Sequence, residues 1–347
     1  MNMGHEVWLT GRELKNKSVG LPPRQGKHIL FRLPFNKGPL FYGLLNIHIF
    51  FFLMRHHFDI LWSVDMDTLP GGRLANFFKR KKIIFDSHEF FSEVPELEKN
   101  KIKKRIWVFL EKKLIPGCDK KYTVSPGLIN LYQTRYNQKF ELLRNLPHLK
   151  SSPGIPLMTT SKPVILYQGA LNIGRGLEET IQAMKFLPNY IFRIVGDGDY
   201  TRELQALARK LNLNNQIEFI GPVPFENLAN YHQNVMAGIC LLHNQGLNYY
   251  YSLPNRLFDY LQAGIPVIAS EFPDMSDIIK KHQTGLLIRD LNPGTIAQTI
   301  RRACEEKSLR EKWQETLPKA AREFTWQEEE KKLYAINFGA KSGIDGH

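Results

Sequence analysis

Residues 252–270, with the sequence SLPNRLFDYLQAGIPVIAS, predict a short helix followed at once by a buried strand. We expect the helix to start on Pro254, because proline lacks the N–H that is unpaired at a first helical position anyway. It should stop at Gly264, since glycine adopts the left-handed conformation that ends many helices. The backbone N–H groups of residues 255–257 then point out of the helix N-terminus and form a site for an anion such as phosphate.

Two side chains of this helix fit the same ligand. Arg256 can add positive charge near the phosphate, and Asp259 follows within about one turn, where it can meet a sugar hydroxyl. Amides for a phosphate and a carboxylate for a ribose are what a nucleotide-sugar site needs. An ordinary crossover helix with a proline start is the alternative interpretation of this pattern.

The composition predicts a globular protein of two ordinary domains. The chain has 347 residues, 43% of them hydrophobic. Its three cysteines are scattered without a paired spacing, so we expect neither disulfides nor a zinc site, and a reducing, cytoplasmic location. The longest apolar stretch, Leu40–Met54, is too short to cross a bilayer and contains Asn46, so it predicts a buried helix.

The net charge of +13 lies in the first part of the chain. Residues 1–150 hold 26 Lys and Arg against 13 Asp and Glu, whereas the remainder is balanced. Residues 79–121 contain the densest basic runs, followed by apolar residues, and such a stretch can lie on an anionic membrane surface at the inner face of the membrane. A solvated helix face is the second interpretation. A nucleic-acid footprint is the third, but no nucleic-acid-binding motif supports it, so we expect no nucleic-acid partner.

Strand and helix patterns alternate along the chain, which predicts an α/β protein with parallel sheets. Expected strands are 6–9, 60–64, 82–85, 121–124, 163–168, 191–195, 217–220, 237–242 and 267–269. We expect an N-terminal Rossmann-like domain at 1–150, a linker at 151–162, a second such domain at 163–317, and a helix at 318–347 that returns to the first domain. The first strand of the N-terminal domain is predicted to be missing. The two doubly wound domains should face one another across a cleft, with ligands at the carboxyl ends of the strands.

Four segments at strand ends carry polar or glycine residues, and the fourth is the start of the helix at Pro254. His88, in Asp-Ser-His-Glu, can orient a sugar or stabilise charge, although it can also simply cap the next helix. Gly169 and Gly196 allow close backbone approach to a ligand, and Arg175 can fork onto phosphate oxygens. We expect no metal at this site. The leaving-group charge would then fall to Arg175, Arg256 and the helix amides.

Together these segments resemble the GT-B retaining glycosyltransferases of glycosyltransferase family 4. The matching segments are residues 86–89, 144–147, 167–170, 175–176, 195–198, 253–260, 263–267 and 324–326. The resemblance implies the GT-B fold and a hexosyl transfer from a nucleotide-sugar donor, without a further cofactor, to a saccharide or lipid-linked acceptor in cell-surface polysaccharide or glycolipid synthesis. Retention would proceed without a protein nucleophile, with the diphosphate leaving group assisting attack by the acceptor.

The resemblance also implies roles for particular residues. His88 would lie near the reacting sugar, Arg175 would bind the diphosphate, and Asp259 would meet the ribose; these three are the candidate catalytic residues. The implied donor-binding set is Gly169, Arg175, Gly196, Tyr251, Leu253, Pro254, Asn255, Arg256 and Asp259.

Two positions depart from the family pattern. Tyr251 stands where the family has the first of two glutamates eight residues apart, and Ala170 stands where it has a basic residue. These departures keep a degenerate or truncated, non-catalytic nucleotide-sugar-binding protein open as an alternative. A nucleotide-sugar epimerase on the same two-domain frame is a further alternative, which predicts turnover without any acceptor.

Overall fold

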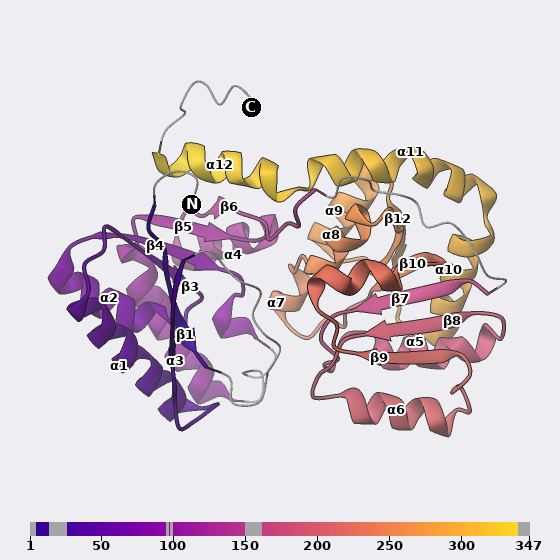
Figure 1. The fold of residues 1–347 in the computed structure, drawn as a ribbon, viewed down its shortest axis with the longest axis horizontal. Helices are drawn as coiled ribbons and strands as arrows, with labels where there is room; N and C mark the ends of the chain where they lie inside the picture. The colour runs from indigo at the N-terminus through magenta and orange to yellow at the C-terminus, as the bar shows by residue number, and fades with distance from the viewer. Residues whose placement is uncertain (1–4, 14–25, 95–96, 98–99, 150–161, 339–347) are drawn as a thin grey trace. The chain divides into compact units, whose positions relative to one another are not determined.

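The computed structural model describes residues 5–13, 26–94, 97, 100–149 and 162–338 of the 347-residue chain. Its contacts divide the chain into a first unit, residues 1–123 with 129–142, and a second unit, residues 124–128 with 143–347. Each unit contains a parallel β-sheet with helices packed against it (Figure 1). The predicted α/β class is therefore confirmed. The predicted linker, apart from Lys162, lies outside the described residues.

The first unit contains a four-stranded parallel sheet in the order β3-β4-β5-β6 and a separate parallel pair, β1-β2. Its elements are β1 (Trp8–Arg12), β2 (Lys27–Phe31), α1 (Pro39–Arg55), β3 (Ile60–Val64), α2 (Leu69–Lys79), β4 (Lys82–Ser87), α3 (Lys101–Leu114), β5 (Lys120–Thr123), α4 (Pro126–Tyr136) and β6 (Glu141–Leu142). Since the strand order advances in one direction, right-handed crossovers place α2 and α3 on the same face of the sheet. The prediction that a first strand is missing is not tested by this arrangement.

Helix α1 is buried along one face only. That face carries Phe41, Leu45, Ile49 and Leu53. Asn46 links the helix to α2, because its side-chain oxygen accepts a hydrogen bond from Gly71 N at 2.7 Å and its amide donates to Asp67 O at 2.8 Å. The opposite face is exposed at Leu40, Ile47 and Phe51. The prediction of a helix here is confirmed, but the expectation that it is buried is wrong for this face.

The second unit contains a six-stranded parallel sheet in the order β12-β11-β10-β7-β8-β9. Its strands are β7 (Val164–Gln168), β8 (Ile191–Val195), β9 (Ile217–Gly221), β10 (Val235–Cys240), β11 (Val267–Ser270) and β12 (Gly285–Ile288). Its helices are α5 (Leu177–Ala183), α6 (Thr201–Lys210), α7 (Leu247–Tyr250), α8 (Asn255–Gln262), α9 (Pro273–His282), α10 (Pro293–Glu305), α11 (Lys307–Glu323) and α12 (Trp326–Phe338). Strand β10 runs two residues earlier than the predicted 237–242.

The core of the second unit lies around β7, whose five residues are all buried. Apolar residues of β8, β10, β11, α5, α8 and α10 pack into the same core. The C-terminal helix α12 is joined to residues 143–149 of this unit, because Trp326 N donates to Pro147 O at 2.8 Å and Arg144 pairs with buried Glu329 at 3.1 Å. The loops at the carboxyl ends of the strands form the candidate site.

Candidate functional site

The topology of the second sheet predicts where a ligand binds. After β7 the chain first builds β8 and β9 on one side and then returns to build β10 on the other. Open parallel sheets bind ligands beyond the carboxyl ends of the strands at such a switch in direction. The segments that follow β7, β8 and β10, together with the start of α8, lie at this edge.

Two glycines hold the loops after β7 and β8 together. Gly169 has φ +128° and Gly196 has φ +142°, a region that L side chains rarely adopt. Gly169 N donates to Val195 O at 2.9 Å, and a Cβ on Gly196 would collide with the carbonyl oxygen of Gly169. The backbone geometry therefore requires glycine at both positions. Both glycines lie in loops that the sequence predicted to approach a ligand.

Helix α8 begins one residue later than predicted. Pro254 has φ −63° and ψ 136° and caps the helix, which starts at Asn255, so the expectation that Pro254 is the first helical residue is wrong. Its carbonyl already accepts the N–H of Leu257 at 2.9 Å. The N–H groups of Asn255 and Arg256 thus lead the helix, because the first amides of a helix have no partner within it.

Arg256 is withdrawn from solvent beneath the β7 loop. It is 7% exposed, and its guanidinium carbon lies 4.9 Å from the centroid of the Tyr167 ring. A Cβ on Gly169 would lie 3.9 Å from Nη1 of Arg256, so the guanidinium borders the glycine turn. Its Nε and Nη2 atoms are buried without a hydrogen-bond partner in the described structure. An arginine stays charged at any ordinary pH, and a buried charge without a partner is costly.

Arg175 supplies a second cation at this edge. It follows Gly174 and precedes Gly176, which have φ +81° and φ +65°. Its guanidinium carbon lies 5.2 Å from the centroid of the Tyr249 ring, and its Nε atom is also buried without a partner in the part of the chain that the structure describes. Burial raises the pKa of the Cys240 thiol at the end of β10, and Arg256 and Arg175 both act in the opposite direction. The two guanidinium groups therefore converge on the end of β10.

Asp259 is held by a chain of side-chain hydrogen bonds. The Gln168 amide donates to Asp259 Oδ2 at 3.1 Å, and the Gln168 carbonyl oxygen lies 3.2 Å from Nε2 of the buried His232. Gln168 is itself fixed, because its backbone N–H donates to the hydroxyl of Tyr260 at 3.1 Å. Neither Gln168 nor His232 was singled out by the sequence pattern. Gln168 could have been identified from its position, because it is a polar residue at the end of a buried strand, directly before Gly169.

Tyr251 and Leu253 have packing roles. Leu253 is 8% exposed and belongs to the hydrophobic core. The carbonyl of Tyr251 accepts a hydrogen bond from Ser125 Oγ at 2.6 Å, and the Tyr251 ring lies against Gly127. Gly127 N also donates to both carboxylate oxygens of Asp274 at 3.1 Å. Burial nevertheless raises the pKa of Asp274 to about 6.

His88 lies in the first unit, at the carboxyl end of β4. Its Nε2 atom is 3.5 Å from Asp86 Oδ2, and its backbone N–H donates to Asp65 Oδ1 at 2.8 Å. The hydrogen bond to Asp86 raises the pKa of His88, although burial acts in the opposite direction. Trp62 Nε1 also donates to Asp86 Oδ2, at 3.1 Å. Contacts within the first unit therefore fix the position of His88, which a residue that holds or transfers a proton requires.

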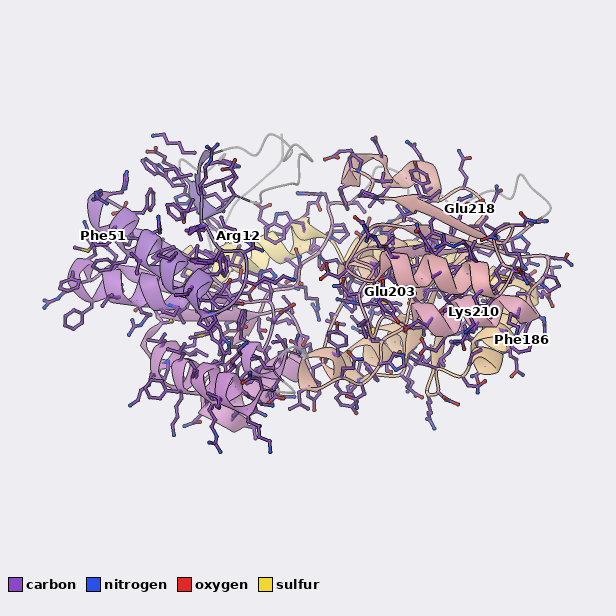
Figure 2. The ribbon with its side chains drawn as sticks, turned by 90° about the horizontal axis from the view of Figure 1, so that it is seen from below. Arg12, Phe51, Phe186, Glu203, Lys210 and Glu218 are labelled. Carbon is purple, nitrogen blue, oxygen red and sulfur yellow. The ribbon has the colours of Figure 1, made fainter. Side chains whose placement is uncertain are left out.

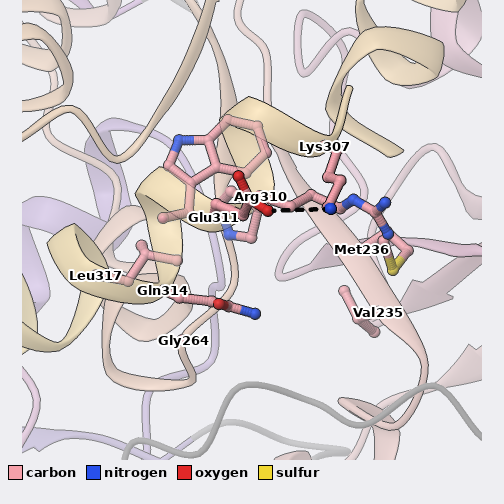
Figure 3. A pocket seen from close by; sticks show the side chains of 10 residues that line it. Val235, Met236, Gly264, Lys307, Arg310, Glu311, Gln314 and Leu317 are labelled. Atoms are coloured by element: carbon pink, nitrogen blue, oxygen red, sulfur yellow. Dashed lines mark ion pairs between the residues drawn. The ribbon is translucent and has the colours of Figure 1, made fainter. Parts of the chain in front are cut away.

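A cavity of about 380 Å³ lies elsewhere in the second unit (Figure 3). It is lined by Val235 and Pro266, at the amino ends of β10 and β11, and by Lys307, Arg310, Trp313 and Leu317 of α11. Gly169 and Gly196 follow the carboxyl ends of their strands, so this cavity opens at the opposite edge of the sheet. It is not the predicted donor site.

Within the described ranges, no group of three or more His, Cys, Asp or Glu side chains could hold a metal ion. The sequence expectation of a metal-independent site stays a prediction.

Comparison with known proteins shows a similarity to glycosyltransferases. Residues 153–320 match the family described as glycosyl transferases group 1. An uncharacterized glycosyltransferase of Methanocaldococcus jannaschii is 23% identical over 317 residues, which cover 86% of this chain and 79% of that protein.

Solved structures share the whole fold. Sucrose-phosphate synthase of Thermosynechococcus elongatus superposes with a TM-score of 0.78 at 18% identity, covering 98% of this chain and 91% of that one. Anabaena HepE, solved in complex with UDP-glucose, superposes with a TM-score of 0.68 at 16% identity, covering 89% of this chain and 86% of that one. The fold is therefore GT-B, with two Rossmann-like units, as the resemblance implied.

Proposed function

We propose that the chain is a retaining hexosyltransferase of the family 4 type, which moves a sugar from a nucleotide-diphosphate sugar to an acceptor hydroxyl. The observation that carries the proposal is Arg256, a buried guanidinium with two unpartnered nitrogens beside the Gly169 turn at the topological switch point. A buried charge of this kind needs an anion, and a diphosphate supplies one. That the Anabaena neighbour was solved with UDP-glucose supports the same class of donor.

The site residues divide the work by chemistry. Arg256, Arg175 and the leading amides of α8 neutralise the diphosphate and the charge that grows on it as it leaves. Asp259, oriented by Gln168, accepts a hydrogen bond from a ribose hydroxyl. Gly169 and Gly196 let the backbone approach the donor closely, and the protonated ring of His88 serves the reacting sugar.

Retention follows from attack on the side from which the leaving group departs. The bond from the anomeric carbon to the diphosphate oxygen breaks, the bond from that carbon to the acceptor oxygen forms, and the acceptor proton passes to the departing diphosphate. The step needs no protein nucleophile and no metal, which are both parts of the proposal. The charge that a basic residue at position 170 would supply comes here from Arg256.

The test is nucleotide release from a panel of UDP-, GDP- and ADP-sugars, with and without saccharide or lipid-linked acceptors and with EDTA present. We expect one donor to release nucleotide only when an acceptor is present, with unchanged rate in EDTA and an unchanged anomeric configuration by NMR. Release of an isomerised sugar nucleotide without acceptor would instead indicate an epimerase. Inversion at the anomeric carbon, or loss of activity in EDTA, would each refute its own part of the mechanism.

A second candidate is a binding protein without turnover. It is favoured by Tyr251, whose ring packs on Gly127 where the family places a carboxylate. This candidate predicts donor binding by calorimetry together with no nucleotide release from any donor and acceptor pair.

We also propose that the protein works at the cytoplasmic face of a membrane, in cell-surface polysaccharide or glycolipid synthesis. Its cysteines, Cys118, Cys240 and Cys304, are all free and buried, which suits a reducing compartment. A lipid-linked acceptor would be reached there.

A further inference from the structure

The three helices α1, α2 and α3 of the first unit each carry an exposed apolar stripe. Its members are Leu40, Ile47 and Phe51 on α1, Leu74, Phe77 and Phe78 on α2, and Ile102, Ile106 and Phe109 on α3. Residues spaced by three, four or seven positions share one face of a helix, so each set forms a single stripe. Phe77 is 75% exposed and Ile102 is 72% exposed.

The stripes of α1 and α2 meet. These helices pack against each other, and α2 also packs against α3. The rings of Phe51 and Phe50 are 5.3 Å apart, those of Phe50 and Phe78 are 6.3 Å apart, and those of Phe78 and Phe77 are 5.3 Å apart. Phe51, labelled on the first unit in Figure 2, is 50% exposed. Monomeric proteins rarely expose a contiguous apolar area of this kind without a partner.

The charge of these helices has one sign. Their sequences contain a single acidic residue, Glu111, which is 0% exposed. Lys104 pairs with Glu93 at 2.9 Å. The other basic residues of α3 have no carboxylate partner among the residues described, namely Lys101, Lys103, Arg105, Lys112 and Lys113.

We propose that this face, the exposed side of α1, α2 and α3, docks the protein on an anionic lipid bilayer. Aromatic and aliphatic side chains enter the interface between headgroups and acyl chains, and each nearby Lys or Arg adds about 1 kcal/mol of attraction to anionic lipid. No helix in the described ranges has the length and apolar character to cross a membrane. A second copy of the chain is a poorer occupant, because two such faces would bring like charges together.

This proposal is independent of the proposed sugar transfer, because it concerns a surface that binds without donor or acceptor. The test is co-sedimentation of the purified full chain with vesicles of phosphatidylcholine alone and with about 30% phosphatidylglycerol. We expect at least about tenfold tighter binding to the anionic vesicles. Equal binding to both vesicles, or binding to neither, overturns the proposal.

Two variants separate the apolar and the charged contributions. Phe77→Ser with Phe78→Ser removes two exposed rings, and Lys103→Glu with Arg105→Glu and Lys112→Glu reverses three charges. Each is expected to weaken binding to anionic vesicles about tenfold or more. The matched control is Phe186→Ser with Lys210→Glu in the second unit, since Phe186 is 53% exposed and Lys210 is also exposed (Figure 2).

The outcomes are distinguishable. Because every altered side chain is exposed, we expect unchanged thermal unfolding and unchanged donor affinity by calorimetry in all three variants. A control that weakens vesicle binding as much as the two test variants overturns the proposal. So does a dimer in light scattering that the Phe77 and Phe78 changes convert to a monomer without affecting vesicle binding. Failure of donor turnover would bear on the proposed function alone.

Discussion

In the second unit, Arg256 and Arg175 hold nitrogens that are buried without a partner, next to a glycine turn at the end of a parallel strand. In the first unit, the unpaired cations of α3 are exposed and lie among apolar side chains. The chemistry of both regions calls for an anion. A buried guanidinium at a strand end suits a small ligand that enters a site, whereas an exposed cationic and aromatic face suits an extended surface. Burial, rather than charge, distinguishes the two kinds of partner.

The largest expected effect is that of Arg256→Met. Loss of a charged hydrogen bond of about 1.5–3 kcal/mol should weaken donor binding between about tenfold and a hundredfold. Thermal unfolding of the ligand-free protein should be unchanged or shifted to higher temperature, because the substitution removes a buried charge that has no carboxylate partner among the described residues. Calorimetry and thermal unfolding measure the two effects on one sample.

The matched control is Arg209→Met, since Arg209 is exposed in the last turn of α6. It should alter neither donor binding nor stability. A strongly destabilised Arg256→Met protein would mean that Arg256 has a structural role, and the contrast between the two units would then lose its basis.

The next prediction is that salt weakens vesicle binding by the first unit far more than donor binding by the second unit. Raising the salt concentration from 0.1 to 1 M shortens the screening length from about 10 to about 3 Å, which affects exposed charges far more than buried ones. Vesicle binding should therefore fall at least about tenfold, whereas donor affinity should change by no more than about threefold. Parallel losses of similar size would show that Arg256 and Arg175 are as screened by solvent as the cations of α3.

These two regions also show what a sequence can predict. Strands 60–64 and 191–195 were predicted at their observed bounds, because short apolar runs there are bounded by polar or glycine residues. The strand-end segments at Gly169 and Gly196 were likewise found where they were predicted. Strand β12 was not predicted, since three of its four residues are partly exposed and its sequence carries no alternation.

The sequence pattern did not predict which side chains and helix faces are buried. Arg256 was expected near the helix end, but its withdrawal depends on Tyr167 and Cys240 from β7 and β10, which no local spacing reveals. In α1, apolar residues surround the helix, so its sequence does not show which face packs against α2. Pro254 was placed one residue too far into α8, because its φ suits both a cap and a first turn.

A smaller effect is expected when a hydrogen bond of the buried site is removed without a change in charge. Gln168→Leu leaves Asp259 without the amide at 3.1 Å that positions it. A hydrogen bond to a carboxylate contributes about 1.5–3 kcal/mol, but the donor loses only the part that comes from the positioning of Asp259. We therefore expect KM for the donor to rise about fivefold with kcat little changed. Gln314→Leu, at an exposed position of α11, is the control. A fall in kcat alone would argue that Gln168 does not act through ribose binding.

The smallest expected effect concerns His88, the group in the first unit whose charge depends on its setting. Asp86 raises the pKa of His88, so Asp86→Asn should lower it, which NMR titration of the ring proton measures with His88→Gln to assign the signal. A raised pKa in the folded state contributes stability that is full below the unfolded pKa of histidine and is lost as pH rises through the folded value. Asp86→Asn should therefore reduce stability at acid pH and leave it closer to that of the natural protein at alkaline pH. Asp59→Asn, an exposed change in the same unit, should leave the titration of His88 in place. An unmoved titration in Asp86→Asn would mean that Asp65, whose carboxylate accepts the backbone N–H of His88, sets its charge instead.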